Sequence, residues 1–149
     1  MIEITPILIF NIIWFILPPY IANMAPAVWG GGPPLDGGRI LSDGRRLFGK
    51  GKTIKGSIVG ILAGIIISLL QHIALPFPSL WYALLRGFLM GAGAIGGDIF
   101  GSFIKRRLNI ESGDAAPILD QLDFMAGAII LVSPLGLPFC IKCCLVSSR

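Results

Sequence analysis

The sequence Gly-Asp-Ile-Phe-Gly-Ser-Phe-Ile-Lys-Arg-Arg occupies residues 97–107 and ends a long apolar run. At about 100° of rotation per residue, Asp98, Ser102 and Lys105 share one face of a helix. An ionisable side chain inside a hydrocarbon layer is costly, and it usually persists only where it lines a polar cavity or binds a ligand. The stretch therefore predicts a transmembrane helix that carries a polar site.

The composition of the whole chain is that of an integral membrane protein. Of its 149 residues, 54% are hydrophobic and 13% are charged, whereas about 25% charged residues is usual in soluble domains. The apolar runs cover, in order, about residues 5–22, 57–75, 81–104 and 117–132, and a weaker one covers 135–146. Since a helical span takes about 20 residues, we expect an all-α fold. It would be a polytopic membrane helical bundle of about five transmembrane helices, forming one domain over residues 1–149.

The basic residues predict the orientation of this bundle. Six lie in the polar section of residues 23–56 and three open the section of residues 105–116, whereas the connection between the second and third runs has none. Positive loops face the cytoplasm, so we expect both sections there and the N-terminus outside. The net charge of +4 therefore arises beside membrane spans, and we expect no nucleic-acid partner. The first run lacks a basic n-region and is interpreted as a retained span.

Two further acids, Asp120 and Asp123, begin the fourth run. Their i, i+3 spacing places both on one helix face, directed toward Asp98 if the third and fourth runs form a hairpin. Carboxylates that converge in a poorly hydrated place repel one another unless a divalent cation neutralises them. The alternative is that they are acids at a helix N-terminus, where each contributes about 0.3–1 kcal/mol, although one acid would suffice. The pattern favours a metal site formed by Asp98, Asp120 and Asp123.

Two segments before the second run carry possible phosphate ligands. Residues 49–56 read Gly-Lys-Gly-Lys-Thr-Ile-Lys-Gly, and glycine backbone amides, a helix N-terminus and lysines all suit an anion. The spacing is not that of a P-loop, and a simple basic juxtamembrane loop is the alternative. Residues 36–39 and 43–46 read Asp-Gly-Gly-Arg and Asp-Gly-Arg-Arg. Asp-Gly pairs favour turns, so these residues are either turn formers or additional phosphate ligands.

The order of these motifs resembles a known family. It runs Lys52-Thr53-x-x-Gly56-x-x-x-Gly60, then Gly97-Asp98-x-x-x-Ser102-x-x-Lys105-Arg106, then Asp120-x-x-Asp123. This is similar to the signature of CDP-diacylglycerol synthases. The short chain and the Asp36 to Arg46 segment are more similar to the archaeal branch, the CDP-archaeol synthases. The chain departs from the bacterial pattern at Gln121, where arginine is common.

The resemblance implies a CTP-dependent cytidylyltransferase of phospholipid biosynthesis in the cell membrane, with its active site facing the cytoplasm. A lipid phosphate, of the unsaturated archaetidic acid type, would attack the α-phosphorus of CTP and release pyrophosphate. Mg²⁺ would be held by Asp98, Asp120 and Asp123, which with Lys105 form the implied catalytic set. The lipid tails would enter between spans, beside glycine-lined faces. The implied nucleotide ligands are Asp36, Arg39, Arg45, Lys52, Thr53, Lys55, Ser102 and Arg106.

Other functional classes remain open from the residues. A small transporter or lipid flippase would also place charges at membrane depth, and it would show vesicle flux without CTP consumption. A CDP-alcohol phosphotransferase requires an Asp-x2-Asp-Gly-x2-Ala-Arg signature, which residues 36–46 do not match. A structural membrane adaptor would need none of these carboxylates.

Overall fold

The fold was obtained as a computed structural model, which describes residues 6–49, 51–108, 110 and 117–135. The helices are α1 (Pro6–Trp29), α2 (Ile54–Ala74), α3 (Leu80–Arg107) and α4 (Pro117–Val132), followed by the short 3₁₀ helix η1 (Ser133–Leu135). Two isolated β-bridges within the loop before α2 are the only extended pairing in the described part of the chain. The predicted all-α fold is confirmed.

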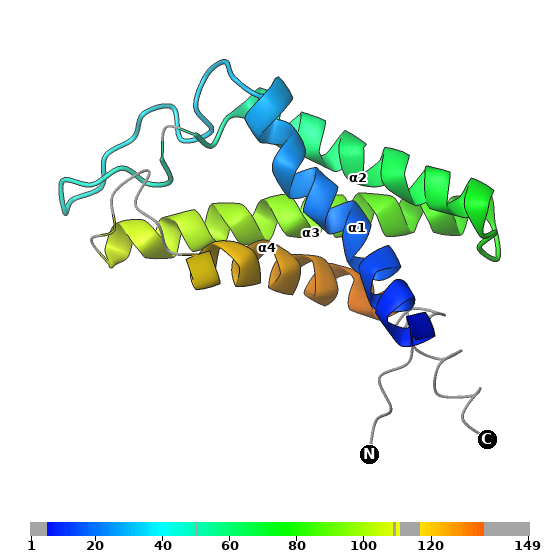
Figure 1. The fold of residues 1–149 in the computed structure, drawn as a ribbon. Helices are drawn as coiled ribbons and strands as arrows, with labels where there is room; N and C mark the ends of the chain where they lie inside the picture. Colours follow the sequence, from blue (N-terminus) through cyan, green and yellow to red (C-terminus); the bar gives the residue numbers. More distant parts are fainter. Residues whose placement is uncertain (1–5, 50, 109, 111–116, 136–149) are drawn as a thin grey trace.

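Helix α3 forms the centre of the bundle (Figure 1). Helix α2 lies along one side of α3 and α4 along the other, while α1 crosses α2 and α3 obliquely. The loop of residues 30–53 projects from one end of the bundle, near the C-terminal end of α3. This arrangement brings the loop, the start of α2, the end of α3 and the start of α4 together at one end.

Glycines allow the helices of this bundle to approach closely. A Cβ built on Gly93 in α3 would lie 2.5 Å from the carbonyl oxygen of Gly127 in α4, and one on Gly64 in α2 would press on the backbone of α3. Small residues at such contacts are typical of membrane helix pairs. Gly93, Gly97 and Gly101 of α3 form a groove in which α4 packs. Entry of lipid tails between spans, beside glycine-lined faces, remains a prediction.

The helix ends follow local capping, and the largest difference from the predicted runs is at the end of α1. Thr53 caps α2 by accepting the Gly56 amide at 3.0 Å, as expected for a threonine in extended conformation at an N-cap. Helix α1 continues past the predicted end near residue 22 as far as Trp29, with Pro26 inside it. Membrane helices tolerate internal prolines because neighbouring groups satisfy the freed carbonyls. The loop before α2 is consequently shorter than the predicted polar section.

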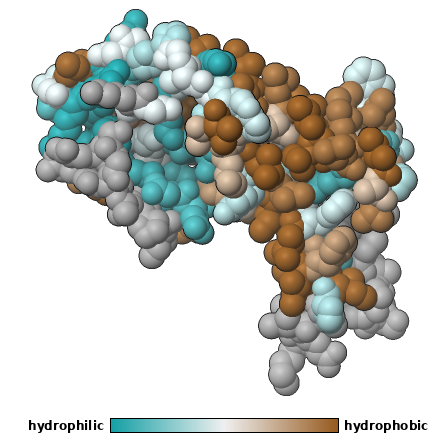
Figure 2. All heavy atoms as spheres, turned by 45° about the horizontal axis from the view of Figure 1, so that its top comes forward, coloured by the Kyte–Doolittle hydropathy of each residue, from teal (hydrophilic) through white to brown (hydrophobic). Residues whose placement is uncertain are grey.

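Three of the helices are long and apolar enough to cross a bilayer, namely α1, α2 and α3. Helix α4 has 16 residues, fewer than the roughly 20 of a typical span. Polar side chains gather at the end that carries the loop, whereas apolar side chains cover the helices elsewhere on the face in Figure 2. The chain is therefore a multi-pass membrane protein. The fifth predicted segment lies outside the described residues beyond Leu135, and the number of spans and the outside N-terminus remain predictions.

A buried polar cluster, which was not predicted from the sequence, joins three helices at the C-terminal end of α2. Arg86 is 3% exposed and donates from Nη1 to Gln71 Oε1 at 2.7 Å and to Ser68 Oγ at 3.3 Å. Gln71 Nε2 donates to the backbone oxygen of Trp14 at 2.5 Å, and the guanidinium lies over the Phe77 ring at 5.0 Å. A buried guanidinium requires such acceptors, so this cluster ties α1, α2 and α3 together.

Candidate active site

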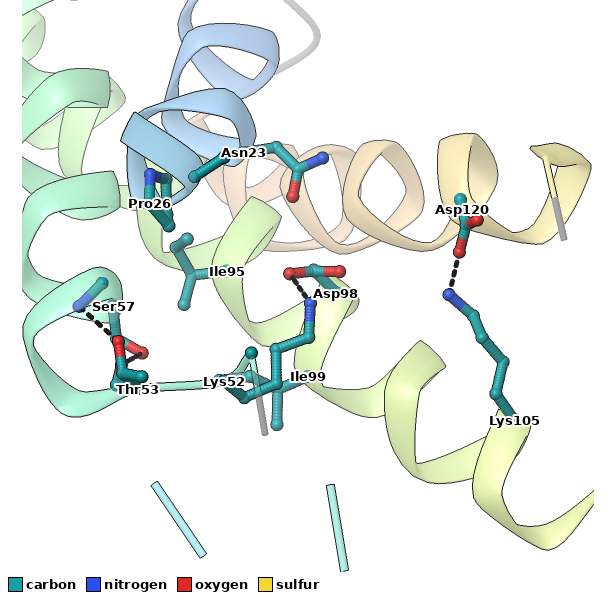
Figure 3. A pocket seen from close by; sticks show the side chains of 13 residues that line it. Asn23, Pro26, Lys52, Thr53, Ser57, Ile95, Asp98, Ile99, Lys105 and Asp120 are labelled. Carbon is teal, nitrogen blue, oxygen red and sulfur yellow. Dashed lines mark hydrogen bonds and ion pairs between the residues drawn. The ribbon is translucent and has the colours of Figure 1, made fainter. Parts of the chain in front are cut away.

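A cavity of about 440 Å³ opens at the loop end of the bundle, between the end of α1, the start of α2, α3 and the start of α4 (Figure 3). Its lining combines charged side chains from three segments, the loop before α2, α3 and α4, with apolar side chains. The lining residues are Asn23, Pro26, Ala27, Gly51, Lys52, Thr53, Gly56, Ser57, Ile95, Asp98, Ile99, Lys105 and Asp120. Five of the predicted site residues therefore face one cavity: Lys52, Thr53, Asp98, Lys105 and Asp120.

The loop holds Lys52 at the cavity through backbone pairing. The Leu35 amide donates to the Lys52 oxygen at 2.7 Å, and the Ile54 amide donates to the Pro33 oxygen at 3.3 Å. These bonds flank the isolated bridge between Pro34 and Thr53. The backbone of Lys52 is thus fixed just before the N-cap of α2, and its side chain reaches across to α3.

Lys52 and Asp98 form an ion pair inside the cavity. Asp98 comes from α3, and its side chain is 20% exposed. Of the three residues predicted to share one helical face, Asp98 and Lys105 line the cavity. Ser102 is buried in the bundle and is not part of the lining. The first cation–carboxylate pair of the site therefore joins the loop to α3.

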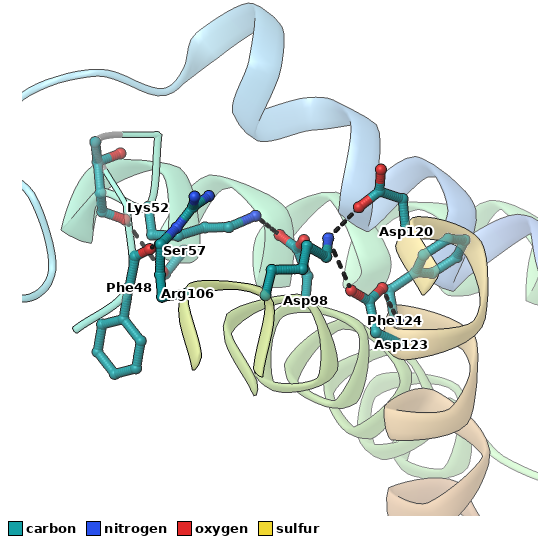
Figure 4. A network of polar contacts seen from close by, with 10 residues as sticks. Phe48, Lys52, Ser57, Asp98, Arg106, Asp120, Asp123 and Phe124 are labelled. Carbon is teal, nitrogen blue, oxygen red and sulfur yellow. Dashed lines mark hydrogen bonds and ion pairs between the residues drawn. The ribbon is translucent and has the colours of Figure 1, made fainter. Parts of the chain in front are cut away.

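A second cation, Lys105, pairs with both acids of α4, Asp120 and Asp123. Its ammonium pairs with Asp120 and lies 3.6 Å from Asp123 Oδ2. Figure 4 shows the side chains of these two acids near Asp98. Asp123 also stands close enough to Asp98 for their charges to repel. The predicted hairpin of the third and fourth runs is thus confirmed as the α3–α4 pair, and it brings all three acids to one region.

The donor set fits a hard divalent cation in its chemistry. Carboxylate oxygens are preferred by Mg²⁺, and Asp123 Oδ2 is buried without a hydrogen-bond partner among the described residues. In this arrangement, however, Lys52 and Lys105 are paired with the acids. No three His, Cys, Asp or Glu side chains in the described ranges are grouped closely enough to hold a metal ion together. Metal binding by Asp98, Asp120 and Asp123 remains a prediction, and it requires the lysines to move.

Asp36 holds the loop together and does not line the cavity. Its buried carboxylate accepts the amides of Gly38 at 2.9 Å and Phe48 at 3.3 Å, and it pairs with Arg46 at 3.2 Å. Burial alone would raise the pKa of Asp36, but these two amides and the guanidinium outweigh it and lower the pKa below 3.8. The contacts support the turn-forming interpretation of this segment.

Arg45 and Arg106 fasten the loop to the end of α3. Arg45 Nη1 donates to the carbonyl oxygens of Arg106 and Arg107, at 3.2 and 3.3 Å. Arg106 Nε donates to the Phe48 oxygen at 3.3 Å. Cations at exposed carbonyls of a helix C-terminus are favourable. These arginines thus anchor the loop, and direct nucleotide contacts by them remain a prediction.

Two other predicted phosphate ligands, Arg39 and Lys55, are exposed and outside the lining. Conversely, the cavity includes residues that the sequence analysis missed, above all Asn23 and Pro26 of α1 and Ser57 of α2. An amide near the end of an apolar run was a usable signal for Asn23. The lining residues of α1 lie beyond residue 22, where the predicted first run ended, so that run did not include them.

Comparison with known proteins agrees with this geometry. The CarS-like family described as CDP-archaeol synthase matches residues 4–147. The chain belongs to this family. A CDP-archaeol synthase of Methanopyrus kandleri is 54% identical over 119 residues, which cover 80% of this chain and 67% of the relative. One of Methanocaldococcus jannaschii is 44% identical over 151 residues, covering 93% and 85%.

A solved structure is also similar, described as an intramembrane enzyme for archaeal membrane lipids biosynthesis. It has a TM-score of 0.79 and 41% identity, covering 93% of this chain and 88% of that one. Both the resemblance and the enzyme class predicted from the sequence, a lipid phosphate cytidylyltransferase, are confirmed. The family membership also argues against the flippase and adaptor interpretations.

Proposed function

We propose that this enzyme transfers the cytidylyl group of CTP to a lipid phosphate of the unsaturated archaetidic acid type. An oxygen of the lipid phosphate attacks the α-phosphorus of CTP, the bond from that phosphorus to the bridging oxygen of the β-phosphate breaks, and pyrophosphate leaves. The product is a CDP-activated lipid. The observation that carries the proposal is one cavity, at an end of apolar helices, that two lysines and two aspartates line, with Asp123 3.6 Å from the Lys105 ammonium.

The lysines are suited to neutralise the substrate phosphates. Phosphoryl and nucleotidyl transfer needs positioning and charge neutralisation more than covalent catalysis by the protein. Lys52 and Lys105 approach the cavity from opposite sides, one from the loop and one from α3 (Figure 3). Each presents a mobile ammonium, which binds phosphate as a point charge. They would hold the α- and β-phosphates and stabilise the charge that develops on pyrophosphate.

The three aspartates would hold Mg²⁺. When bound, Mg²⁺ supplies charge neutralisation across phosphate oxygens and favours departure of pyrophosphate. Asp123 is the most confined of the three, with a side chain 6% exposed. Asp120, at 46%, is the most accessible. This difference in side-chain exposure suits an ion that Asp123 anchors on its buried side and that contacts the nucleotide on its solvent-accessible side.

The reaction does not require a strong general base. A phosphate monoester has its second pKa near 6, so the lipid phosphate is already ionised at neutral pH. The only histidine of the chain is His72. It lies at the other end of α2, away from the cavity, where its Nδ1 accepts a hydrogen bond from the Phe77 amide at 2.9 Å. Orientation of the lipid phosphate toward CTP is then the main task of the site.

The lipid would reach this cavity from the bilayer. Large apolar side chains are exposed along α1 and α2 beside the lining, among them Met24, Val28 and Ile58. The chains of the lipid can remain in the hydrocarbon layer against such faces while the phosphate enters the polar cavity. The proposed site faces the cytoplasm, where CTP is available.

The test is turnover by purified protein in lipid nanodiscs. The assay contains an archaetidic-acid-type lipid phosphate, Mg²⁺ and one of CTP, ATP, GTP or UTP, with pyrophosphate followed by a coupled assay and the lipid product by mass spectrometry. We expect stoichiometric pyrophosphate and CDP-lipid with CTP, and no product when Mg²⁺ is chelated. Absence of CDP-lipid with CTP, in protein that remains folded, would contradict the proposal.

A further inference from the structure

Lys105 occupies an unusual position for a phosphate-binding lysine, because it is already paired with two acids. Its side chain is 9% exposed, and its ammonium lies between Asp120 and Asp123. Lysine is costly to bury without acceptors, and here both acceptors belong to the predicted metal-binding group. The same carboxylates therefore cannot serve Lys105 and a divalent cation fully at the same time.

Asp123 is incompletely satisfied by this lysine. Its Oδ2 is 3.6 Å from the Lys105 ammonium, beyond hydrogen-bond range, and it has no hydrogen-bond partner within the described part of the chain. The carboxylate cannot move closer to α3, since it already lies against Gly101. A buried carboxylate oxygen without a donor is unfavourable, so this position retains capacity for another cation.

The local charges also favour binding of another cation beside Asp123. Three aspartates face two lysines, which leaves one negative charge uncompensated at the meeting point of α3 and α4. A divalent cation would more than balance that charge and would free an ammonium. A lysine can follow such an exchange, because its ammonium is a compact charge on a flexible four-carbon chain.

We propose that Lys105 is an exchangeable cation. In the nucleotide-free enzyme it holds the Asp120–Asp123 pair, and when a divalent cation takes these carboxylates its ammonium turns away from them within the cavity and binds a substrate phosphate. This inference rests on the proposed function, since it assumes the metal and the phosphate substrate. It assigns to one residue two successive partners.

The exchange makes a quantitative prediction for metal binding without nucleotide. A metal ion can bind only the conformation in which Lys105 has left the two carboxylates. If about 10% or less of the wild-type protein has this conformation, the apparent metal affinity is lowered about ten-fold or more. Removing the ammonium should therefore tighten metal binding by about that factor. A lysine that only stabilises the fold would have no such effect, or would weaken binding through loss of structure.

The experiment measures Mn²⁺ binding to nucleotide-free protein by electron paramagnetic resonance. Lys105→Met and Lys105→Gln are compared with the wild type and with Lys55→Met, which removes the same charge from an exposed position outside the cavity. We expect about ten-fold tighter Mn²⁺ binding in both Lys105 variants and little change in Lys55→Met. Thermal unfolding of each variant establishes that it is folded.

The second measurement is binding of CTP at saturating Mn²⁺ in the absence of lipid, by isothermal titration calorimetry. Loss of a charge-assisted contact to phosphate should weaken CTP binding of Lys105→Met about ten-fold, opposite in sign to the effect on the metal. Lys105→Arg keeps the charge and should retain weak, wild-type-like Mn²⁺ binding. This variant serves as the folded comparison if Lys105→Met fails to fold.

Unchanged or weaker Mn²⁺ binding in folded Lys105→Met and Lys105→Gln would overturn the exchange, even if the wild type converts CTP to CDP-lipid. Equal tightening in Lys55→Met would also overturn it, because the effect would then be general electrostatics. Failure of the proposed function is seen separately, as absence of CDP-lipid synthesis by the wild type.

Discussion

The carboxylate of Asp123 in α4 lies directly against the backbone of Gly101 in α3, where a Cβ would collide with it. Gly97, one turn earlier, meets the backbone of Asp123 in the same way. The position of this acid is therefore set by the absence of side chains on α3. Packing and chemistry are coupled here, because the contact that joins the two helices also places a predicted metal ligand.

Gly101→Ala should displace the Asp123 carboxylate and lower kcat. A misplacement of about 1 Å costs about 100-fold in rate in well-oriented sites. Gly96→Ala is the matched control, since a Cβ at Gly96 meets no atom within 4 Å. It should keep near wild-type activity, and the comparison is made by CDP-lipid formation in nanodiscs. Equal activity in the two variants would show that Asp123 needs no fixed position.

Replacing the acids one at a time should remove turnover. Asp98→Asn, Asp120→Asn and Asp123→Asn each leave a similar shape without a charge, and we expect kcat to fall about 100-fold or more. Asp43→Asn provides the same chemical change at an exposed loop position outside the cavity, and it should retain most activity. A near-normal rate in any of the three would remove that residue from the metal site.

Asp36 should make stability depend on pH. Its folded pKa is lowered, because amide donors and Arg46 outweigh burial. Its stabilising contribution is then present above the ordinary pKa of 3.8 and is lost as pH falls through the lower, folded pKa. Thermal unfolding between pH 7 and pH 3 should show a large Tm difference between wild type and Asp36→Asn at neutral pH that narrows at the acid end. A constant difference would contradict this assignment.

The buried polar cluster should contribute to stability and not to catalysis. Gln71→Leu removes the best acceptor of Arg86, and an unsatisfied buried donor costs about 1–3 kcal/mol. Gln71→Glu keeps the acceptor for Arg86 but loses the donor to the Trp14 oxygen, so its Tm should lie between those of Gln71→Leu and the wild type. The KM for CTP should be unchanged in both, because the cluster lies at the opposite end of α2 from the cavity. A Tm of Gln71→Leu equal to wild type would show that the contact is not stabilising.

The predicted orientation can be tested with single cysteines. Ser42→Cys lies in the loop before α2 and Pro78→Cys in the turn before α3, both at exposed positions, in a background where Cys140, Cys143 and Cys144 are serine. A membrane-impermeant maleimide should label the first in inside-out vesicles and the second in right-side-out vesicles. The reverse pattern would place the active site outside the cell.

The class of fold could be predicted from the chain alone because it depends on composition and period. Apolar runs of membrane length, ended by charged residues, require helices, since only internally bonded backbone is stable in lipid. The fourth run was predicted with the bounds that α4 has, residues 117–132. Local spacing also placed Asp98 and Lys105 on one face. These conclusions need no knowledge of which helices are neighbours.

The partners of each charge depended on contacts between distant segments. The loop pairs with residues just before α2, and this carries Lys52 to Asp98, 46 positions later. Arg45 and Asp36 bind backbone groups that no motif identifies. The buried polar cluster around Arg86 likewise forms only when α1, α2 and α3 pack together. Periodicity acts within a helix, whereas an ion pair is decided by the distance between helices, and close glycine contacts set that distance in this bundle.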